Sequence, residues 1–387
     1  MEAYPNSGAD LKISLLTNEW PPRVYGGAGV HVVELSKELS RLVGLEIRCF
    51  GEEREDALAF TSAARLADAN PSFRVLSTDL LMAAYMDGID VVHSHTWYTN
   101  FAGHLAKLVH GIPHVLTTHS LEPSRPWKEE QLHGGYAVSS LCERLAIEAA
   151  DAVIAVSGAM RDDVLRLYPA VEPKRIHVVY NGIDAQRYHP DPDVDVLEAE
   201  GVDPARPSVV FVGRITHQKG IEHLLEAAHA FSPAAQLVLA AGAPDTPELA
   251  AEVERRVAEL QAERDAVIWI ERMLEQREVI QLLSHATCFV CPSVYEPLGI
   301  VNLEAMACGA AVVASAVGGI PEVVVDGETG LLVPPAEPVA LAAAVNELVG
   351  DPERARGLGE AGRERAVTEF GWRRVAAQTV DLYRSLR

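Results

Sequence analysis

Two acidic residues lie in an otherwise apolar stretch near residue 300, and acids in such a setting are candidates for chemistry. Glu296 and Glu304 are eight positions apart in SVYEPLGIVNLEAMACG (293–309). A buried carboxylate needs a hydrogen-bonding or charged partner. Three kinds of partner fit this pair: the hydroxyl groups of a sugar, a metal ion, or a basic residue of the chain such as Arg272. The spacing alone leaves these alternatives open.

The acids are separated by a predicted turn. TCFVCPS (287–293) has the composition of a buried strand, and a helix is expected over 300–308. Pro297 and Gly299 break the chain between them. A glycine before the free N–H groups of a helix start allows a ligand to approach the backbone closely.

Two cations lie on a second loop of the same kind. Arg214 ends the apolar run VVFVGR (209–214), and Lys219 lies five residues later, at the start of a predicted helix. Arginine offers phosphate oxygens a planar fork and lysine offers them a mobile point charge. The alternative is two solvated loop charges, which a position at the carboxyl end of a strand disfavours. The pair therefore predicts an anion site.

A glycine-rich turn follows the first predicted strand. Gly26, Gly27 and Gly29 precede a clear amphipathic helix. The dinucleotide fingerprint GxGxxG is absent, because its last position is Val32. We favour a contact with an anion or a sugar phosphate over tight turn geometry alone.

The elements that must position these residues follow from an alternation of short apolar runs and longer amphipathic stretches. This pattern is typical of parallel sheets with helices on both faces. Strands are predicted at 12–17, 45–50, 73–77, 90–95, 114–119, 152–157, 209–214, 236–242, 266–270, 287–293 and 311–315. Helices are predicted at 29–43, 98–109, 131–150, 158–168, 219–231, 247–263, 275–285, 300–308, 337–349 and 353–369.

The alternation is interrupted once. Residues 181–208 are rich in Asp, Pro and Gly and lack apolar periodicity, so we interpret them as an interdomain linker. We expect an α/β protein with two doubly wound domains at 1–187 and 208–369, a linker at 188–207, and a final helix at 370–387 that packs back on the first domain. Ligands of such domains bind at the carboxyl ends of the strands.

Bulk composition excludes several classes of protein. The 387 residues are 48% hydrophobic and carry a formal net charge of −22 at pH 7, which argues against a nucleic-acid binder or a protein of anionic membrane surfaces. Five scattered cysteines do not suggest a disulfide framework. Neither a leader peptide nor an apolar run of about 18 residues is evident, so a cytoplasmic location is expected.

Three further patterns have simpler explanations that we favour. The CxxC pair in 287–293 lies in a predicted buried strand, which indicates core cysteines. The DxD-like acids between Asp191 and Asp195 lie in the predicted linker and read as solvated charge. His93 and His95 point to one side of a predicted strand, as in some zinc sites, but companion ligands are not evident.

Taken together, the motifs resemble those of one enzyme family. They are GGAGVH (26–31), Arg-x4-Lys at 214 and 219, Glu-x7-Glu at 296 and 304, VVYNGID (178–184) and GGIPEVVVDGETGLLVPP (318–335). The chain resembles the retaining, nucleotide-sugar-dependent glycosyltransferases of family 4 over nearly its whole length. This resemblance implies the GT-B fold, in which two Rossmann-like domains face each other across a cleft, the first on the acceptor side and the second binding the nucleotide sugar.

Within the family, the chain most resembles the short bacterial glycogen synthase type, whose members make α-maltose-1-phosphate from ADP-glucose and glucose-1-phosphate. That implies a glucosyltransferase of glycogen and α-glucan biosynthesis that uses no metal and no cofactor. Long bacterial glycogen synthases have a lysine just before the paired glycines, where this chain has Val24 and Tyr25. The difference favours a small sugar-phosphate acceptor. Extension of an α-1,4-glucan and a homodimer stay open.

The resemblance also implies residue roles. Arg214 and Lys219 would hold the diphosphate and stabilise the departing nucleotide, where removing one donor typically costs roughly 10²–10³ in rate. Glu296 would contact the donor sugar hydroxyls and face the cationic sugar ring. Glu304 would accept hydrogen bonds from the ribose, and His119 matches the family's histidine beside the donor sugar.

The other implied contacts divide between donor and acceptor. Donor contacts would come from the N–H groups of Leu298, Gly299 and Ile300, from Gly26 and Gly27 beside the diphosphate, and from Arg272 near the base. Acceptor candidates are Tyr98, Asn100, Ser120, and the two cations Arg125 and Lys128 for the acceptor phosphate.

Three rival functions remain at this level. One is a family 4 glycosyltransferase with another donor or acceptor, such as a mannosyl- or N-acetylglucosaminyltransferase. Another is a nucleotide-sugar epimerase on the same two-domain plan, which would need no acceptor. The third is a nucleotide-sugar sensor without catalysis.

Overall fold

A computed structural model describes residues 10–24, 26–126, 128–129 and 134–387, so Tyr25 lies outside the described residues. The chain forms two compact units. Unit 1 contains Met1–Gly182 and Trp372–Arg387, and unit 2 contains Ile183–Gly371. The division falls five residues before the end that the sequence suggested for the first domain. The final helix belongs to unit 1.

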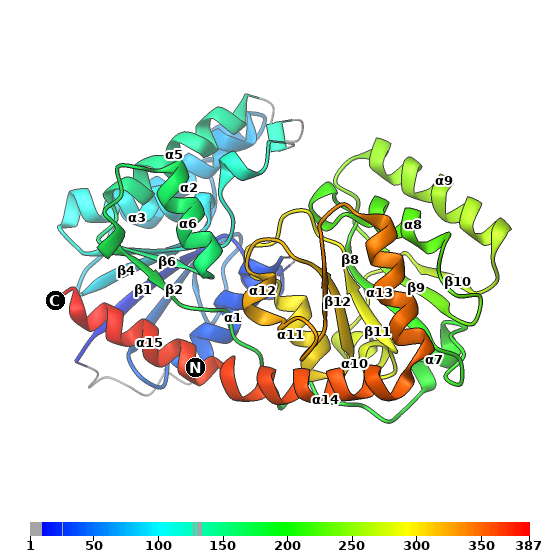
Figure 1. The fold of residues 1–387 in the computed structure, drawn as a ribbon. Helices are drawn as coiled ribbons and strands as arrows, with labels where there is room; N and C mark the ends of the chain where they lie inside the picture. The colour runs from blue at the N-terminus through cyan, green and yellow to red at the C-terminus, as the bar shows by residue number, and fades with distance from the viewer. Residues whose placement is uncertain (1–9, 25, 127, 130–133) are drawn as a thin grey trace. The chain divides into compact units, whose positions relative to one another are not determined.

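Unit 1 is built on a parallel sheet with the strand order β3-β2-β1-β4-β5-β6-β7 (Figure 1). Its strands are β1 (Lys12–Thr17), β2 (Gly44–Phe50), β3 (Leu58–Phe60), β4 (Val91–His95), β5 (His114–Thr118), β6 (Ala152–Ala155) and β7 (Ile176–Val178). Strands β4, β5 and β6 are buried at every position, as expected for parallel strands covered on both faces. Since β4 and β5 run parallel in register, with His95 opposite Thr117, the loops after them start side by side.

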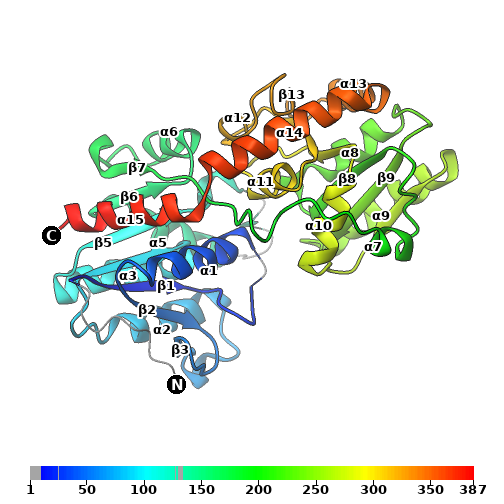
Figure 2. The same ribbon diagram turned by 90° about the horizontal axis from the view of Figure 1, so that it is seen from below.

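The helices of unit 1 include one from the far end of the chain. They are α1 (Gly27–Leu39), α2 (Pro71–Ala83), α3 (Trp97–His110), α5 (Gly135–Ala149), α6 (Gly158–Leu167) and α15 (Trp372–Ser385). Helix α15 lies beside α1 in both views (Figures 1 and 2). It is anchored where Trp372 covers Gly182, since a Cβ added there would lie 2.5 Å from the indole ring.

The prediction of a strand at 73–77 is wrong, because these residues belong to α2. The Asn70 side chain accepts a hydrogen bond from Ser72 N at 2.9 Å and caps the helix, and Pro71 occupies its first turn. Val75 and Met82, seven residues apart, are buried on one helix face. The apolar run was therefore part of a helical repeat that a short window could not distinguish from a strand.

Unit 2 is a second parallel sheet with the strand order β10-β9-β8-β11-β12-β13. Its strands are β8 (Ser208–Arg214), β9 (Gln236–Gly242), β10 (Val267–Ile270), β11 (Cys288–Cys291), β12 (Ala311–Ser315) and β13 (Leu331–Val333). Its helices are α7 (Asp195–Ala199), α8 (Ile221–Ala228), α9 (Pro247–Glu263), α10 (Gln276–Ser284), α11 (Ile300–Ala307), α12 (Ile320–Val323), α13 (Pro338–Gly350) and α14 (Pro352–Glu369). The two sheets bear out the expected α/β fold.

The stretch expected to be a linker is part of unit 2. It contains the short helix α7, whose Val196 and Leu197 are buried. The Gln281 side chain of α10 accepts from Val196 N at 2.7 Å and ties the segment down. Asp195 binds Arg277 at 2.7 Å, so this acid of the DxD-like run forms an ion pair on the surface of the unit.

Each unit has its own apolar core. In unit 2 both faces of the central strands are covered, and in unit 1 α1 and α15 share a core with β1. All five cysteines are unpaired and buried, which confirms the expected core role of the CxxC pair, Cys288 and Cys291. Among the described residues, no helix has both the length and the apolar character needed to cross a membrane.

Candidate active-site residues in each unit

In unit 2 the loops after β8 and β11 pack directly against each other. Gly220, with φ +61°, lies so close to the loop after β11 that an added Cβ would be 2.2 Å from the Pro292 carbonyl oxygen. Val294 N donates to Gln218 O at 3.0 Å in the same contact. The packing brings Lys219 of one loop to Glu296 of the other, although they are 77 positions apart.

Lys219 and Glu296 form a mostly buried ion pair. The Lys219 Nζ to Glu296 Oε2 distance is 2.6 Å, with the lysine side chain 25% and the glutamate side chain 8% exposed. Ser293 Oγ donates to the same carboxylate oxygen at 3.3 Å. Burial lowers the pKa of Lys219, but the adjacent Glu296 carboxylate outweighs it and raises that pKa above the ordinary value. Lys219 is therefore a permanent cation at neutral pH.

The backbone of Glu296 is held by the glycine pair of a third loop. Gly319 N donates to Glu296 O at 3.0 Å. Gly318 has φ +56°, and an added Cβ would lie 2.0 Å from the same carbonyl oxygen. A side chain at Gly318 would thus both strain the backbone and displace Glu296.

Helix α11 starts directly after the loop that carries Glu296. Its N-cap Gly299 has φ +91°, which favours glycine, while Leu298 is buried and Ile300 is the first helical residue. The first N–H groups of a helix have no partner within the helix, and they carry a positive partial charge. Asn302, which sequence reasoning missed, is fully buried beside Gly299, and neither of its amide atoms has a hydrogen-bond partner among the described residues.

Glu304 lies one turn into α11. Burial raises its pKa to about 7, while a hydrogen bond with Tyr188 and the charge of Lys219 pull the pKa down. This carboxyl group therefore changes its charge near neutral pH. Tyr188 belongs to the segment expected to be a linker, so its position could not be found from the local pattern.

The two other cations of unit 2 that the sequence singled out, Arg214 and Arg272, lie in different surroundings. Arg214, at the end of β8, has a 49% exposed side chain that lies 3.4 Å from Asp245 Oδ1, and its charge acts on Lys219. Arg272 binds Glu200 at 2.5 Å and Glu278 at 2.7 Å. Arg272 is thus engaged with acids other than Glu296 and Glu304. The alternative of a basic partner within the chain is borne out for Glu296 by Lys219, and Arg272 as that partner is wrong.

In unit 1 the glycine-rich turn surrounds a carboxylate. Gly26 N donates to Glu19 Oε2 at 2.9 Å, and a Cβ added at Gly29 would lie 2.5 Å from that same oxygen. Gly27 is the first residue of α1. The acid Glu19, which the sequence did not single out, therefore stands where an anion was expected, so a phosphate group could use the Gly26 N–H only after Glu19 has moved.

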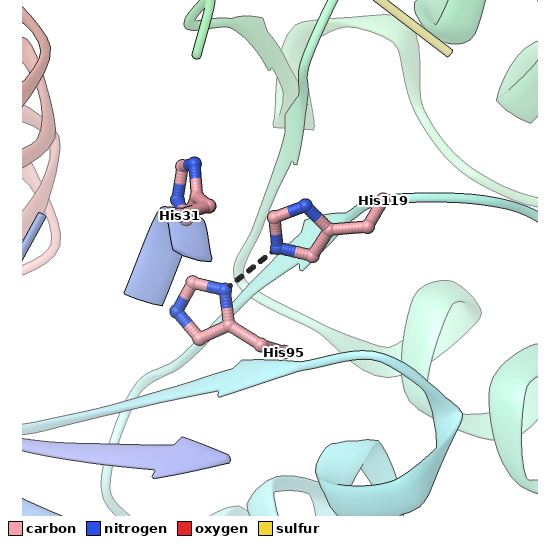
Figure 3. A group of neighbouring side chains, drawn as sticks. All are labelled: His31, His95 and His119. Carbon is pink, nitrogen blue, oxygen red and sulfur yellow. Dashed lines mark hydrogen bonds between the residues drawn. The ribbon is translucent and has the colours of Figure 1, made fainter. Parts of the chain in front are cut away.

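Three histidines converge at the carboxyl edge of the unit 1 sheet (Figure 3). His31 comes from α1, His95 ends β4 and His119 follows β5, with one ring nitrogen from each within 4.8 Å of the others. Burial lowers the pKa of His31 to about 4 and holds those of His95 and His119 well below the ordinary value. His119, predicted from the sequence, is thus a neutral imidazole. The sequence did not link His31 to it.

The acceptor candidates occupy different environments. Arg125 donates to Glu122 Oε1 at 2.6 Å, and Glu122 is fully buried and also accepts from Ser139 Oγ at 2.7 Å. Tyr98 stacks on Trp97 with ring centroids 4.3 Å apart.

Asn100 points into the core of unit 1. It is 2% exposed and accepts from Ser94 Oγ at 2.9 Å, which fits a supporting role better than substrate contact. Ser120 and Lys128 are half-buried on the segment after β5.

Comparison with known proteins covers the chain almost from end to end. Residues 25–187 match the family described as Glycosyltransferase Family 4, and residues 196–365 match Glycosyl transferases group 1. Alpha-maltose-1-phosphate synthases of Mycolicibacterium smegmatis and Mycobacterium tuberculosis are 57% and 55% identical over an alignment of 385 residues, and the alignment covers 97% of this chain and 100% of theirs.

Solved structures agree on the fold. Sucrose-phosphate synthase from Thermosynechococcus elongatus has a TM-score of 0.80 at 28% identity, covering 97% of this chain and 99% of its own. Anabaena HepE in complex with UDP-glucose has a TM-score of 0.78 at 22% identity, covering 97% of this chain and 100% of its own, and shows likeness of fold alone.

Proposed function

This chain belongs to the GT-B glycosyltransferases of family 4, and from that premise we propose that it transfers glucose from ADP-glucose to glucose-1-phosphate to form α-maltose-1-phosphate. The relatives that are 57% and 55% identical over their full length carry the name of that activity. The single observation in the structure that supports it most is the Lys219–Glu296 pair, with Arg214 on the same loop as Lys219.

The proposed chemistry uses these charges at different moments. The bond between the glucose C1 and the diphosphate oxygen breaks, a bond from C1 to a hydroxyl oxygen of the acceptor forms, and the proton of that hydroxyl passes to the departing diphosphate. Charge builds up on the departing diphosphate, where Lys219 and Arg214 would stabilise it. The Glu296 carboxylate would hold sugar hydroxyls and stabilise positive charge on the ring.

The backbone N–H groups of Leu298, Gly299 and Ile300, just before and at the start of α11, would bind the sugar and phosphate. Glu304 would accept from the ribose, and its pKa of about 7 makes that contact dependent on pH. Gly26 and Gly27 would bind the diphosphate once Glu19 leaves the Gly26 N–H. His119 would donate its single N–H to a donor hydroxyl as a neutral ring.

For the acceptor, the Arg125 guanidinium is the best-supported cation. Glu122 neutralises part of its charge and fixes its orientation through the 2.6 Å contact. A phosphate monoester carries enough charge to bind beside such a held guanidinium, whereas a neutral glucan does not need one. We therefore favour glucose-1-phosphate over an α-1,4-glucan.

Finer features of the enzyme are part of the proposal. We infer a retaining reaction from the resemblance to family 4. We infer that it needs no catalytic metal because the cationic side chains of Lys219 and Arg214 are available for the leaving group. A cytoplasmic location is supported by the five unpaired buried cysteines. Arg272 near the base has the least support, since two glutamates already occupy it.

A direct assay tests the proposal. The purified chain is incubated with ADP-glucose and either glucose-1-phosphate or glycogen in a chelator, and the products are identified by mass spectrometry and by the anomeric proton coupling. The expected result is α-maltose-1-phosphate from the first mixture at a rate well above any glucan extension. Glycogen as the only acceptor used, a β-linked product, or an epimerised sugar nucleotide without acceptor would each overturn it.

A screen of other nucleotide sugars completes the test. UDP-glucose, GDP-mannose and UDP-N-acetylglucosamine are offered with the same acceptor, and ADP-glucose is expected to have the highest kcat/KM. A preference for any of the others would place the chain with another donor specificity in the same family.

A further inference from the structure

The three histidines that converge in unit 1 have the geometry of a metal centre. We propose that His31, His95 and His119 bind one Zn²⁺ ion through their imidazole nitrogens, with the fourth position open to water. The donor chemistry suits this ion, since zinc is commonly held by imidazole and often by three histidines plus water. All three ligands come from unit 1, on α1, the end of β4 and the segment after β5 (Figure 3).

The ring positions fit tetrahedral coordination. A Zn–N bond of about 2.0–2.1 Å places two ligand nitrogens about 3.3 Å apart and two ring centroids about 5 Å apart. The centroid separations here are 4.7 Å between His31 and His119, 5.3 Å between His95 and His119, and 5.4 Å between His31 and His95. His95 Nδ1 and His119 Nε2 share a hydrogen bond of 3.0 Å, which an ion held by both nitrogens would replace after a small opening of the two rings.

The hydrogen bonds leave His31 with a free lone pair. His31 Nδ1 lies 2.7 Å from Asn181 Oδ1, which can only accept, so Nδ1 carries the proton. His31 Nε2 is then an unprotonated base, and it is buried with no partner among the described residues. A metal-bound histidine usually donates its other ring N–H to an oxygen in this way.

The neighbouring His93 shows what a purely structural histidine looks like here. It is fully buried, and both of its nitrogens are satisfied, by Tyr383 Oη at 2.6 Å and Thr117 Oγ1 at 2.8 Å. Nearly all buried polar atoms in proteins are paired. In the same cluster His31 Nε2 is buried without a partner among the residues that the structure describes, and the His95 ring is paired only through Nδ1, with His119 Nε2.

The backbone beside the cluster is also strained. Thr96, directly after His95, has φ +65° and ψ +163°, a region adopted almost only by glycine. Such strain persists when surrounding contacts enforce it and clusters at functional sites. It fixes the direction in which β4 ends and therefore the placement of the His95 ring.

Occupancy of this site would inhibit the enzyme, a consequence that rests on the proposed function. His119 is the residue proposed to donate a hydrogen bond to the donor sugar. A ring that coordinates zinc through one nitrogen is fixed in orientation and loses its freedom to meet the sugar. Zn²⁺ would therefore lower kcat/KM for ADP-glucose, and a chelator would restore it.

Binding is tested on the full-length chain, freed of metal with a chelator and titrated with Co²⁺ as a spectroscopic substitute and then with Zn²⁺. One tetrahedral Co²⁺ per chain is expected, with visible ligand-field bands, no thiolate charge-transfer band, and displacement by Zn²⁺. His31→Gln and His95→Gln should weaken binding by roughly 100-fold or more, and Asn181→Leu by about 10- to 100-fold. His229→Gln, in an exposed pair with Glu263 at 2.7 Å, is the control and should bind normally.

Three outcomes overturn the site: no tetrahedral Co²⁺ spectrum, a thiolate band that assigns the ion to cysteine, or unchanged binding in both His31→Gln and His95→Gln. Far-ultraviolet circular dichroism in chelator checks that these variants are folded. Should a variant be unfolded, the ¹⁵N shifts of the imidazoles in the wild-type chain decide, since three rings must shift on addition of Zn²⁺.

The inhibition is measured separately as α-maltose-1-phosphate formation with and without Zn²⁺. Zinc that binds at the three rings but leaves the rate unchanged refutes the inhibition and keeps the site. A chain that binds zinc but makes no α-maltose-1-phosphate in chelator refutes the proposed function instead. The two failures are therefore distinguishable.

Discussion

Replacing Lys219 with methionine should separate the structural and catalytic roles of its charge. Lys219→Met keeps the unbranched apolar part of the side chain and removes the ammonium that lies 2.6 Å from Glu296 Oε2. Glu296, 8% exposed, would then hold a nearly buried carboxylate that still accepts a hydrogen bond from Ser293 Oγ at 3.3 Å.

The expected loss of stability follows from that burial. Removing one partner of a fully buried ion pair costs about 3–5 kcal/mol, because the other charge is left uncompensated. Lys219 is 25% exposed, so water already screens part of the attraction, and we expect a fall of about 2 kcal/mol in the free energy of unfolding of unit 2. The double variant Lys219→Met/Glu296→Gln should recover most of this, because no unpaired charge remains.

Activity should respond differently. The departing diphosphate loses a cation in both variants, so kcat/KM for ADP-glucose should fall by roughly 10²–10³, and the double variant should not recover it. The assays are urea denaturation for stability and initial rates of α-maltose-1-phosphate formation for activity. Arg255→Met, in an exposed ion pair on α9 at 2.5–2.8 Å from its glutamates, is the control and should change the free energy of unfolding by less than about 0.5 kcal/mol.

Two results would refute this reasoning. If the double variant is no more stable than Lys219→Met, the loss does not come from an unpaired Glu296 carboxylate. If Lys219→Met keeps a near-normal kcat/KM, then Lys219 does not stabilise the leaving group, and the role of this loop in the proposed reaction falls.

Three further predictions concern other parts of the two units. Gly318→Ala should lower the free energy of unfolding by more than the about 1–2 kcal/mol that a left-handed alanine costs, and it should cut kcat/KM by about 10²-fold because it displaces Glu296. The control Gly327→Ala is also at positive φ but has nothing within 4 Å of the added Cβ, so it should cost only the backbone strain. Equal effects of the two variants in denaturation and rate assays would contradict the clash at Gly318. Since the pKa of Glu304 is raised to about 7, its contribution to stability is fully present below about pH 4.5 and is lost as the pH rises through 7, whereas ribose binding by the carboxylate should weaken as the pH falls below 7. Urea denaturation and KM for ADP-glucose, measured across pH, should show both trends in the wild-type chain and neither in Glu304→Gln. A pH profile that is the same in both proteins would argue against this residue. Arg125→Leu should raise KM for glucose-1-phosphate by about 10-fold with little effect on KM for ADP-glucose, as expected for loss of a charge-assisted hydrogen bond, whereas a rise in the donor KM would move Arg125 to the other substrate.

Most of the fold was accessible from the sequence because it depends on local burial patterns. Strands such as β8 and β11 are continuous apolar runs, and helices such as α9 have caps and a clear apolar face. The error at 73–77 arose where the run was too short to show its period, and the strands β3, β7 and β13 were missed because each has only three residues. Neither error touches the edges of the sheets that carry the candidate residues.

The motif residues of unit 2 were also accessible, because their types and spacing are tied to loops that follow strands. The residues that they contact could not be predicted from the sequence. Nothing near Lys219 in the chain indicates that Glu296 meets it, and nothing near Glu304 indicates Tyr188. Both pairings depend on which strands are neighbours in the sheet and on how the loops pack.

The amino-acid pattern alone therefore determined that the chain forms two parallel α/β units and which loops carry the acids, cations and glycines, since hydrophobic periodicity and turn residues act over a few positions. Only the folded structure decided that Glu19 occupies the glycine-rich turn and that His31 joins His95 and His119. These contacts join residues far apart in the chain, and they exist because parallel strands end at one edge and helix packing then brings distant side chains within a few ångströms.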